Sequence, residues 1–391
     1  MSVRRSVLVL GSLTAFGPLS LDLYLPALPN LGDDLQTNES MAQLTMAACM
    51  LGLGLGQFVF GPMSDRYGRK IPIIVGVSMF TLFSVLCAFA PNIGVLLLFR
   101  FLQGVGGSAG QSVARACVRD MYDGSLLVRM FSLLMLVSGA APILAPVIGG
   151  ALTLVMDWRG TFLVLAGIGA TLTLVAVLGL RETLPAERRS PGGFGHVIGS
   201  FGLVVRDRIF LVMMLALSFT TASFTSYLTM SSFVFQQEFA LTPVGFSLLF
   251  AINSVAIITG AQVNGLLSRR FSSTRLLTVA LSCSAVATVS LMITAMIGSP
   301  LAVVAVLLTC VMFFQGWVMP NSTAIALQRH GRHAGSASAL LGAVQFTVGP
   351  TVGPLVSLIA VSAQTLSTTM AIGVVGALLV VLLFLPKKPE A

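Results

Sequence analysis

The stretch Gly61-Pro62-Met63-Ser64-Asp65-Arg66-Tyr67-Gly68-Arg69-Lys70 is a short polar turn between two apolar runs, residues 43–62 and 72–90. A helix of about 20 residues rises about 30 Å, the thickness of the hydrocarbon core of a bilayer, so the turn joins two predicted membrane spans. Its glycines allow close helix approach and positive φ. Asp65 is placed either to cap a helix N-terminus or to meet a nearby arginine. An acid–arginine contact can latch two helical bundles, whereas the simpler interpretation is a turn that carries topogenic charge.

The composition agrees with a membrane protein. Of the 391 residues, 56% are hydrophobic and 9% are charged, against roughly 25% charged in soluble domains. A mean hydropathy of +0.96 leaves too few polar residues to cover a surface in water, which excludes a cytosolic enzyme. The predicted fold class is an all-α polytopic membrane protein with twelve transmembrane helices. The expected spans are residues 6–28, 43–62, 72–90, 93–114, 131–155, 160–180, 209–235, 244–267, 275–297, 301–326, 335–360 and 366–385.

The positive charges predict the orientation. Of the 22 Lys and Arg residues, all except Arg100 and Arg159 fall at cytoplasmic ends if the N-terminus is inside, as the positive-inside rule requires. We therefore expect both termini in the cytoplasm, and the net charge of +9 requires no nucleic acid as a partner. His196, His330 and His333 fall in cytoplasmic loops, where solvated structural roles are expected. The five cysteines show no metal-ligand spacing, so no metal site is expected.

The longest connection, residues 181–208, is rich in charge, proline and glycine and is interpreted as a cytoplasmic linker. It separates residues 1–180 from residues 209–391, and each part has six expected spans. A shift of the chain by 204 positions aligns Gly61 with Gly265, Ser64 with Ser268, Arg66 with Arg270, Gln111 with Gln315, Pro146 with Pro350 and Gly149 with Gly353. Two parallel six-helix repeats are typical of a rocking transporter, and twelve spans can enclose a pathway within a monomer.

Two formal charges remain inside the expected spans, Asp22 in the first and Arg100 in the fourth. Both lie roughly 9 to 11 Å from the outer ends of their helices at 1.5 Å per residue. A charge at this depth faces protein or water and usually has a partner, so we predict that the two residues pair. The pair either fixes helix register only, or Asp22 exchanges a proton or cation during transport while Arg100 tunes its affinity.

Small and polar residues recur around these charges. On the first span Thr14, Pro18, Asp22 and Pro26 are spaced by four residues, which predicts one polar, kinked helix face. On the fourth span a similar stripe consists of Arg100, Gly104, Gly107 and Gln111. Gly106 and Gly110 form a GxxxG pair that favours close packing against a neighbouring helix.

The fifth span contains the string 142–150, in which prolines and small residues are expected to break the helix for close packing or a bend. The residues concerned are Pro142, Pro146, Gly149 and Gly150. A substrate cavity would be mostly apolar with a few polar groups. The candidates, each of which could equally form an interhelical hydrogen bond, are Tyr24, Gln111, Tyr227, Asn253 and Gln315.

Together these strings resemble the major facilitator superfamily, and within it the drug/proton antiporters of the bicyclomycin and chloramphenicol resistance type. Residues 61–70 resemble the loop signature of the family, and residues 100–104 (Arg-Phe-Leu-Gln-Gly) its fourth-helix motif. Residues 21–26 (Leu-Asp-Leu-Tyr-Leu-Pro) and 181–185 (Arg-Glu-Thr-Leu-Pro) are similar to motifs of this branch. The fifth-helix string resembles the antiporter motif, although Ala145 stands where glycine is usual.

The resemblance implies the major facilitator fold of two six-helix bundles in a bacterial inner membrane. It also implies proton coupling by Asp22 and Arg100 and a hinge in the string 142–150. The gating residues would be Gly61, Asp65, Arg66, Gly68 and Arg69. The second copy of the loop carries Arg269 at the position of Asp65 and Ser272 at that of Gly68, so an asymmetric latch is expected.

The expected function is export of a small amphipathic drug in exchange for protons, by alternating access between the halves. The alternative is uptake of a small metabolite by proton symport. No cofactor is expected, because the chain has no GxxxxGK[ST] motif and its glycine-rich stretch 104–110 lies inside a span. A membrane enzyme would need a catalytic cluster at membrane depth, where this chain has one acid and no histidine, and a sensor without flux is a further alternative.

Overall fold

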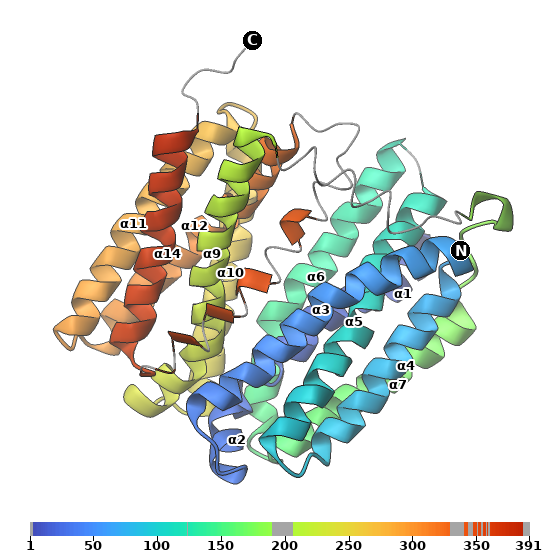
Figure 1. The fold of residues 1–391 in the computed structure, drawn as a ribbon, viewed down its shortest axis with the longest axis horizontal. Helices are drawn as coiled ribbons and strands as arrows, with labels where there is room; N and C mark the ends of the chain where they lie inside the picture. Colours follow the sequence, from blue (N-terminus) through green and yellow to red (C-terminus); the bar gives the residue numbers. More distant parts are fainter. Residues whose placement is uncertain are drawn as a thin grey trace. The chain divides into compact units, whose positions relative to one another are not determined.

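A computed structural model describes residues 3–122, 124–189, 206–328, 340–342, 347–349, 351–352, 355–356, 358 and 360–385. All regular elements within these ranges are helices (Figure 1). Several features of the sequence lie outside the described residues: residues 190–205 of the predicted linker, His196, His330, His333, and the repeat partners Pro350 and Gly353. Most of the expected span 335–360 also lies outside them.

The chain divides into two compact units. Unit 1 comprises Met1–Phe194 and Leu241–Ala251, and unit 2 comprises Gly195–Ala240 and Ile252–Ala391. The helices that precede residue 194 are α1 (Val3–Asp22), α2 (Leu28–Asp34), α3 (Glu39–Tyr67), α4 (Lys70–Ala88), α5 (Ile93–Met121), α6 (Gly124–Leu152) and α7 (Trp158–Gly179). The helices that follow residue 194 are α9 (Arg208–Phe233), α10 (Pro243–Leu267), α11 (Ser273–Met296), α12 (Leu301–Leu327) and α14 (Ala363–Phe384). The first part of α10, up to Ala251, belongs to unit 1.

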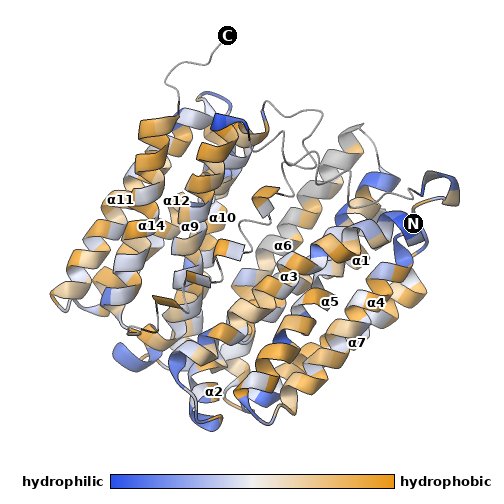
Figure 2. Ribbon diagram, in the orientation of Figure 1, coloured by the Kyte–Doolittle hydropathy of each residue, from blue (hydrophilic) through white to orange (hydrophobic). Residues whose placement is uncertain are grey.

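Short polar side chains set the starts of several long helices. Asn38 accepts a hydrogen bond from the backbone N–H of Met41 at the start of α3, and Asn92 does the same for Val95 at the start of α5. Such N-caps satisfy backbone donors that lipid cannot. Nine helices in the described ranges are long and apolar enough to span a membrane, and Figure 2 shows hydrophilic residues concentrated at their ends.

The first expected span ends earlier than predicted. α1 stops at Asp22, and the chain continues through a 3-10 turn at Leu25–Ala27 into the short helix α2. Pro26 is the second residue of that turn; proline has no N–H and clashes with the preceding helical turn, so α1 cannot continue through it. The prediction that Thr14 and Pro26 share one continuous helix face is therefore wrong, although Thr14 and Asp22 both lie in α1 and are buried.

Glycines bring the helices of unit 1 into close contact. A Cβ at Gly104 would collide with the backbone of Cys49, so α5 and α3 pack backbone to backbone. Gly106 faces the backbone of α4, whereas Gly110 faces the carbonyl of Leu13 in α1. The predicted GxxxG pair thus contacts two different helices, because successive faces of the central helix α5 meet different neighbours.

The helix order repeats along the chain. α3 begins at Glu39 and α10 at Pro243, 204 positions later, and α1, α4, α5 and α7 have counterparts in α9, α11, α12 and α14. An acid at a helix end recurs at the same spacing. Asp34 accepts a hydrogen bond from the indole N–H of Trp158 at 3.0 Å, and Glu238 accepts one from the backbone N–H of Ala363 at 2.6 Å. Each acid therefore holds the start of the last helix in its own repeat.

Candidate functional site

The turn after α3 is shorter than predicted. Residues 61–67 belong to α3, and only Gly68 and Arg69 lie between α3 and α4. Gly68 has φ of +90°, a left-handed conformation that favours glycine. A Cβ at Gly61, by contrast, would meet no atom within 4 Å. Of the two glycines, Gly68 is the one that the local geometry requires.

Arg69 is the centre of a network of acids and hydroxyls. Its side chain is only 9% exposed; its guanidinium pairs with Asp65 and donates from Nε to Oδ2 of Asp120 at 2.7 Å. Nη1 also donates to Oγ of Ser64 at 2.8 Å. Burial by itself lowers the pKa of Arg69, but the hydrogen bonds to the two carboxylates raise the pKa above its ordinary value. The turn therefore carries a firmly protonated arginine between α3 and α5.

Glu182 binds the same turn from the end of α7. Its carboxylate accepts backbone N–H bonds from Arg69 at 2.7 Å and from Lys70 at 3.2 Å, and further bonds from Thr183 and Leu184. A Cβ at Gly68 would collide with this carboxylate. Partial burial raises the pKa of Glu182, but the four N–H donors outweigh it and lower the pKa below 4.5.

The network differs in membership from the predicted gating set. Asp65 and Arg69 are members, but Arg66 is exposed and its guanidinium lies 5.3 Å from the ring centroid of Tyr67. Asp120 and Glu182 were not predicted. The signal that could have found Glu182 was its place in the string 181–185, directly after a span, where a carboxylate can reach the neighbouring helix start.

Asp22 and Arg100 do not pair. Both are buried, at 6% and 0% exposure, and neither takes part in an ion pair among the described residues. Arg100 lies 4.9 Å from the ring centroid of Tyr24 and 5.4 Å from that of Phe162. The predicted pair is therefore wrong in this structure, because the chain turns after Asp22 and Tyr24 occupies the position against the guanidinium.

Polar groups satisfy part of the Arg100 side chain. Nη1 donates to Oε1 of Gln103 at 2.7 Å, and Nε donates to the carbonyl of Thr45 at 3.3 Å. Gln103 in turn donates to Oγ of Ser84. Nη2 of Arg100 has no hydrogen-bond partner among the described residues. The guanidinium is thus held by amide, carbonyl and aromatic groups, and both N–H donors of Nη2 remain open within the described ranges.

The proline string of α6 does not break the helix. α6 continues through both Pro142 and Pro146 to Leu152. Gly149 packs against the carbonyl of Leu23, and Gly150 packs against Ser247 in the part of α10 that belongs to unit 1. Of the two predictions for this string, close packing is the one that the structure displays.

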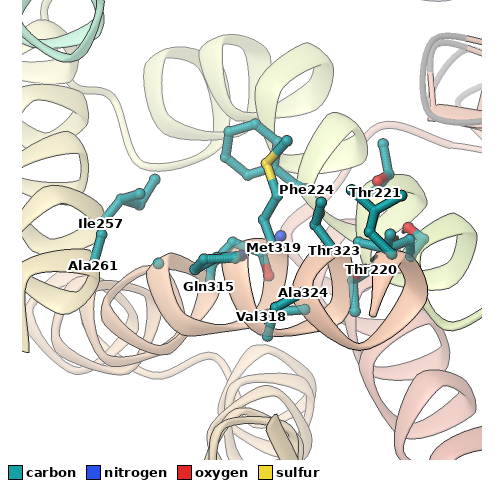
Figure 3. A pocket seen from close by; sticks show the side chains of 14 residues that line it. Thr220, Thr221, Phe224, Ile257, Ala261, Gln315, Val318, Met319, Thr323 and Ala324 are labelled. Atoms are coloured by element: carbon teal, nitrogen blue, oxygen red, sulfur yellow. Dashed lines mark hydrogen bonds between the residues drawn. The ribbon is translucent and has the colours of Figure 1, made fainter. Parts of the chain in front are cut away.

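A cavity of about 690 Å³ lies within unit 2. Figure 3 shows Gln315, Met319 and Thr323 on α12, with Phe224 from α9 and Ile257 from α10. Residues 315, 319 and 323 are spaced by four and so share one helix face. The remaining lining residues are Leu217, Thr220, Thr221, Ala261, Gly316, Val318, Pro320, Ala324 and Leu327.

Of the five predicted cavity residues, only Gln315 lines this cavity. Asn253 donates to the hydroxyl of Tyr227 at 3.0 Å and accepts from Thr309, so these two residues form interhelical hydrogen bonds. Tyr24 is fully buried in unit 1 with its hydroxyl 3.0 Å from that of Thr45, and Gln111 is half-buried on α5. Sequence reasoning missed Phe224, Met319 and Thr323 because apolar residues and threonines are common in every span.

Comparison with known proteins identifies the family. The model of the Major Facilitator Superfamily matches residues 10–354. The chain belongs to the Major Facilitator Superfamily. It is 38% identical to an uncharacterised MFS-type transporter, YdgK of Bacillus subtilis, over 95% of this chain and 93% of that protein. It is 28% identical to a bicyclomycin resistance protein homolog of Haemophilus influenzae, with 90% and 88% covered, and 30% identical to multidrug resistance protein D of Escherichia coli, with 97% and 95% covered.

Solved structures show the same fold. The xylose transporter XylE of E. coli, in a partially occluded inward-open conformation, matches with a TM-score of 0.77 at 14% identity, over 98% of both chains. The human organic anion transporter MFSD10 matches with a TM-score of 0.69 at 19% identity, over 97% of this chain and 100% of that chain. This chain is therefore a multi-pass membrane transporter with the twelve-helix major facilitator fold.

Proposed function

We propose that this transporter exports small amphipathic drugs in exchange for protons, by alternating access between residues 1–180 and residues 209–391, joined by the linker 181–208. Two relatives that it matches over most of their length carry names of drug resistance, for bicyclomycin in one case and for multiple drugs in the other. The proposal includes a monomer in a bacterial inner membrane with both termini in the cytoplasm.

The observation that carries the proposal is the state of Asp22. This residue is 6% exposed at the C-terminal end of α1, inside the first expected span, and it forms no ion pair among the described residues. A buried charge without a partner is costly in a membrane protein, and protonation removes that charge. Asp22 is therefore the group at which a proton can be taken up and released during the cycle.

The other predicted residues have supporting roles in this proposal. Arg100, whose Nη2 has no partner among the described residues, sets the local field close to the end of α1. The network of Asp65, Arg69 and Asp120, with Gly68 in the turn, latches the cytoplasmic side in one conformation. Gly61 and Arg66 flank that latch, and the string 142–150 supplies the small residues on which α6 rocks.

The first test is drug susceptibility of an efflux-deficient bacterium that expresses the wild type or Asp22→Asn. The panel is chloramphenicol, bicyclomycin and ethidium, and membrane abundance is measured for every variant. We expect resistance to at least one compound in the wild type and none in Asp22→Asn. Asp33→Asn is the matched control, because Asp33 is an exposed acid on α2 and its loss should leave resistance unchanged.

The compound with the largest effect is then followed in everted vesicles that carry a defined pH gradient. Export predicts that the compound accumulates inside everted vesicles when their lumen is acidic, together with alkalinisation of the lumen. Accumulation of the compound in right-side-out vesicles, driven by protons that enter with it, would favour the symport alternative. The coupling role would be refuted if Asp22→Asn still accumulated the compound against its gradient.

A further inference from the structure

The cavity of unit 2 has no charged side chain among its described lining residues. Its walls are mostly aliphatic and aromatic, with Phe224 from α9 and Met319 from α12 among the apolar groups. A cation that entered would lose its hydration without gaining a carboxylate. Attraction to a single phenyl ring is weaker than that loss, so the cavity favours an uncharged ligand.

The polar side chains that line the cavity are neutral: the amide of Gln315 and the hydroxyls of Thr220, Thr221 and Thr323. The amide of Gln315 makes no hydrogen bond to another described residue. The next residue, Gly316, also lines the cavity, and Pro320 lies four positions later in the same helix. Proline has no N–H, so the carbonyl of Gly316 lacks its usual helical donor. Gln315 and Gly316 therefore offer acceptors to a ligand N–H or O–H, and Gln315 can also donate.

The described lining residues of the unit 2 cavity include no acid, whereas the equivalent helix of unit 1 carries one. Met319 and Ala324 in the cavity wall correspond, at the spacing of 204, to Arg115 and Asp120 on α5. The helix that is ionic in one half is neutral in the other. If α12 had kept the residues of α5, an aspartate would stand at position 324 in the cavity wall.

We propose that the unit 2 cavity binds an uncharged, largely apolar molecule that carries a hydrogen-bond donor, and that Gln315 with the Gly316 carbonyl recognises this donor. The inference rests on the proposed export function for the claim that the bound molecule is cargo. It defines the class of cargo as neutral rather than permanently cationic, and it assigns Gln315 as the residue that determines this specificity.

Equilibrium binding to the purified full-length protein in lipid nanodiscs tests the inference. The chain has two tryptophans, Trp158 in unit 1 and Trp317 between the cavity residues Gly316 and Val318. In Trp158→Phe, fluorescence therefore reports from Trp317 alone, which lies on the same helix as Gln315. Chloramphenicol is the uncharged probe with hydroxyl and amide donors, its 3-acetate has one donor fewer, and tetraphenylphosphonium is the permanent cation. Equilibrium dialysis of labelled chloramphenicol with unmutated protein covers the case in which Trp158→Phe does not fold.

We expect saturable quenching of Trp317 by chloramphenicol, weaker binding of the acetate, and at least tenfold weaker binding of tetraphenylphosphonium. Gln315→Leu should weaken chloramphenicol binding about tenfold, as expected when a buried polar contact is lost. Gln315→Glu should reverse the preference, because it adds the missing carboxylate. Gln262→Leu is the matched control, because Gln262 is exposed on α10 and does not line the cavity.

The inference is overturned if chloramphenicol shows no saturable binding, if the cation binds as tightly as chloramphenicol, or if Gln315→Leu binds like the control. The measurements use one pH and no gradient. They can therefore fail while Asp22-dependent export in vesicles stands, and they can succeed when that export fails.

Discussion

Two turns occupy equivalent positions in the repeat, residues 61–70 and residues 265–274, and they are held in different ways. In the first turn the Arg69 guanidinium binds Asp65 and Asp120, and the Glu182 carboxylate accepts the backbone N–H of Arg69. At the equivalent positions the second has Ser273, Arg269 and Ala324. There α11 starts with Ser272, whose hydroxyl accepts the N–H of Arg275, and residues 268–272 are exposed.

The difference shows that one backbone arrangement can serve two purposes. A helix needs only a small cap to begin, and Ser272 supplies it in the second turn. The ion network of the first turn exceeds this requirement, and the latch proposed above would make use of this excess. The same contrast holds deeper in the membrane, where Asp22 and Arg100 correspond to Ser226 and Val304.

The largest effect is expected for Arg69→Ser, which gives the first turn the residue of the second. It leaves Asp65 and Asp120 without their cation, and we expect unfolding to become easier by about 2 kcal/mol and transport to be lost. Thermal unfolding in nanodiscs and vesicle flux measure the two effects. Arg270→Ser in the second turn is the control for stability, and equal melting temperatures of the two variants would contradict the contrast between the turns.

Gly68→Ala should have the next largest effect. Its φ of +90° and the nearby Glu182 carboxylate both oppose a Cβ, and backbone at this φ with ψ of 172° costs an L-residue roughly 1–3 kcal/mol. Thermal unfolding measures the loss. Gly61→Ala and Gly265→Ala should cause no loss of stability, because both positions are helical and a Cβ at either meets no atom within 4 Å. A lower melting temperature for Gly61→Ala would contradict the open space that surrounds Gly61 in this structure.

A smaller effect is expected in the second turn. Ser272→Ala removes the N-cap of α11, which costs about 1 kcal/mol, and should leave transport intact. Arg269→Asp gives the second turn the acid that the first has at Asp65. No ion network should form, because Ser273 stands at the position equivalent to Arg69. Full transport by both variants checks this; loss of transport in Arg269→Asp with normal folding would reveal a role for the second turn.

The smallest effect concerns pH. The pKa of Glu182 is lower in the folded protein than its ordinary value of 4.5, so its contribution to stability is present above pH 4.5 and is lost as the pH falls through the lowered pKa. Melting temperatures between pH 7 and pH 3 should therefore fall less steeply for Glu182→Gln than for the wild type. Parallel curves would mean that the carboxylate is not held by the turn.

Much of the fold followed from local properties of the chain. Apolar runs of membrane length predicted the spans, because lipid demands internally bonded helices wherever the chain crosses it. The asymmetry of the two turns was also visible in sequence, from Arg269 in place of Asp65. The end of α1 was mispredicted because hydropathy continues past Asp22, whereas the prolines that follow stop the helix.

The sequence alone thus determined the helical membrane fold, its repeat, and the chemical identity of the unusual residues. The tertiary structure decided which of them meet: Arg69 with Asp120 and Glu182, Arg100 with Tyr24 instead of Asp22, and Gln315 with a neutral cavity. Hydropathy is a property of each segment by itself and can be read along the chain. Pairing depends on how helices rotate and where they end, and those are set by packing between segments far apart in sequence.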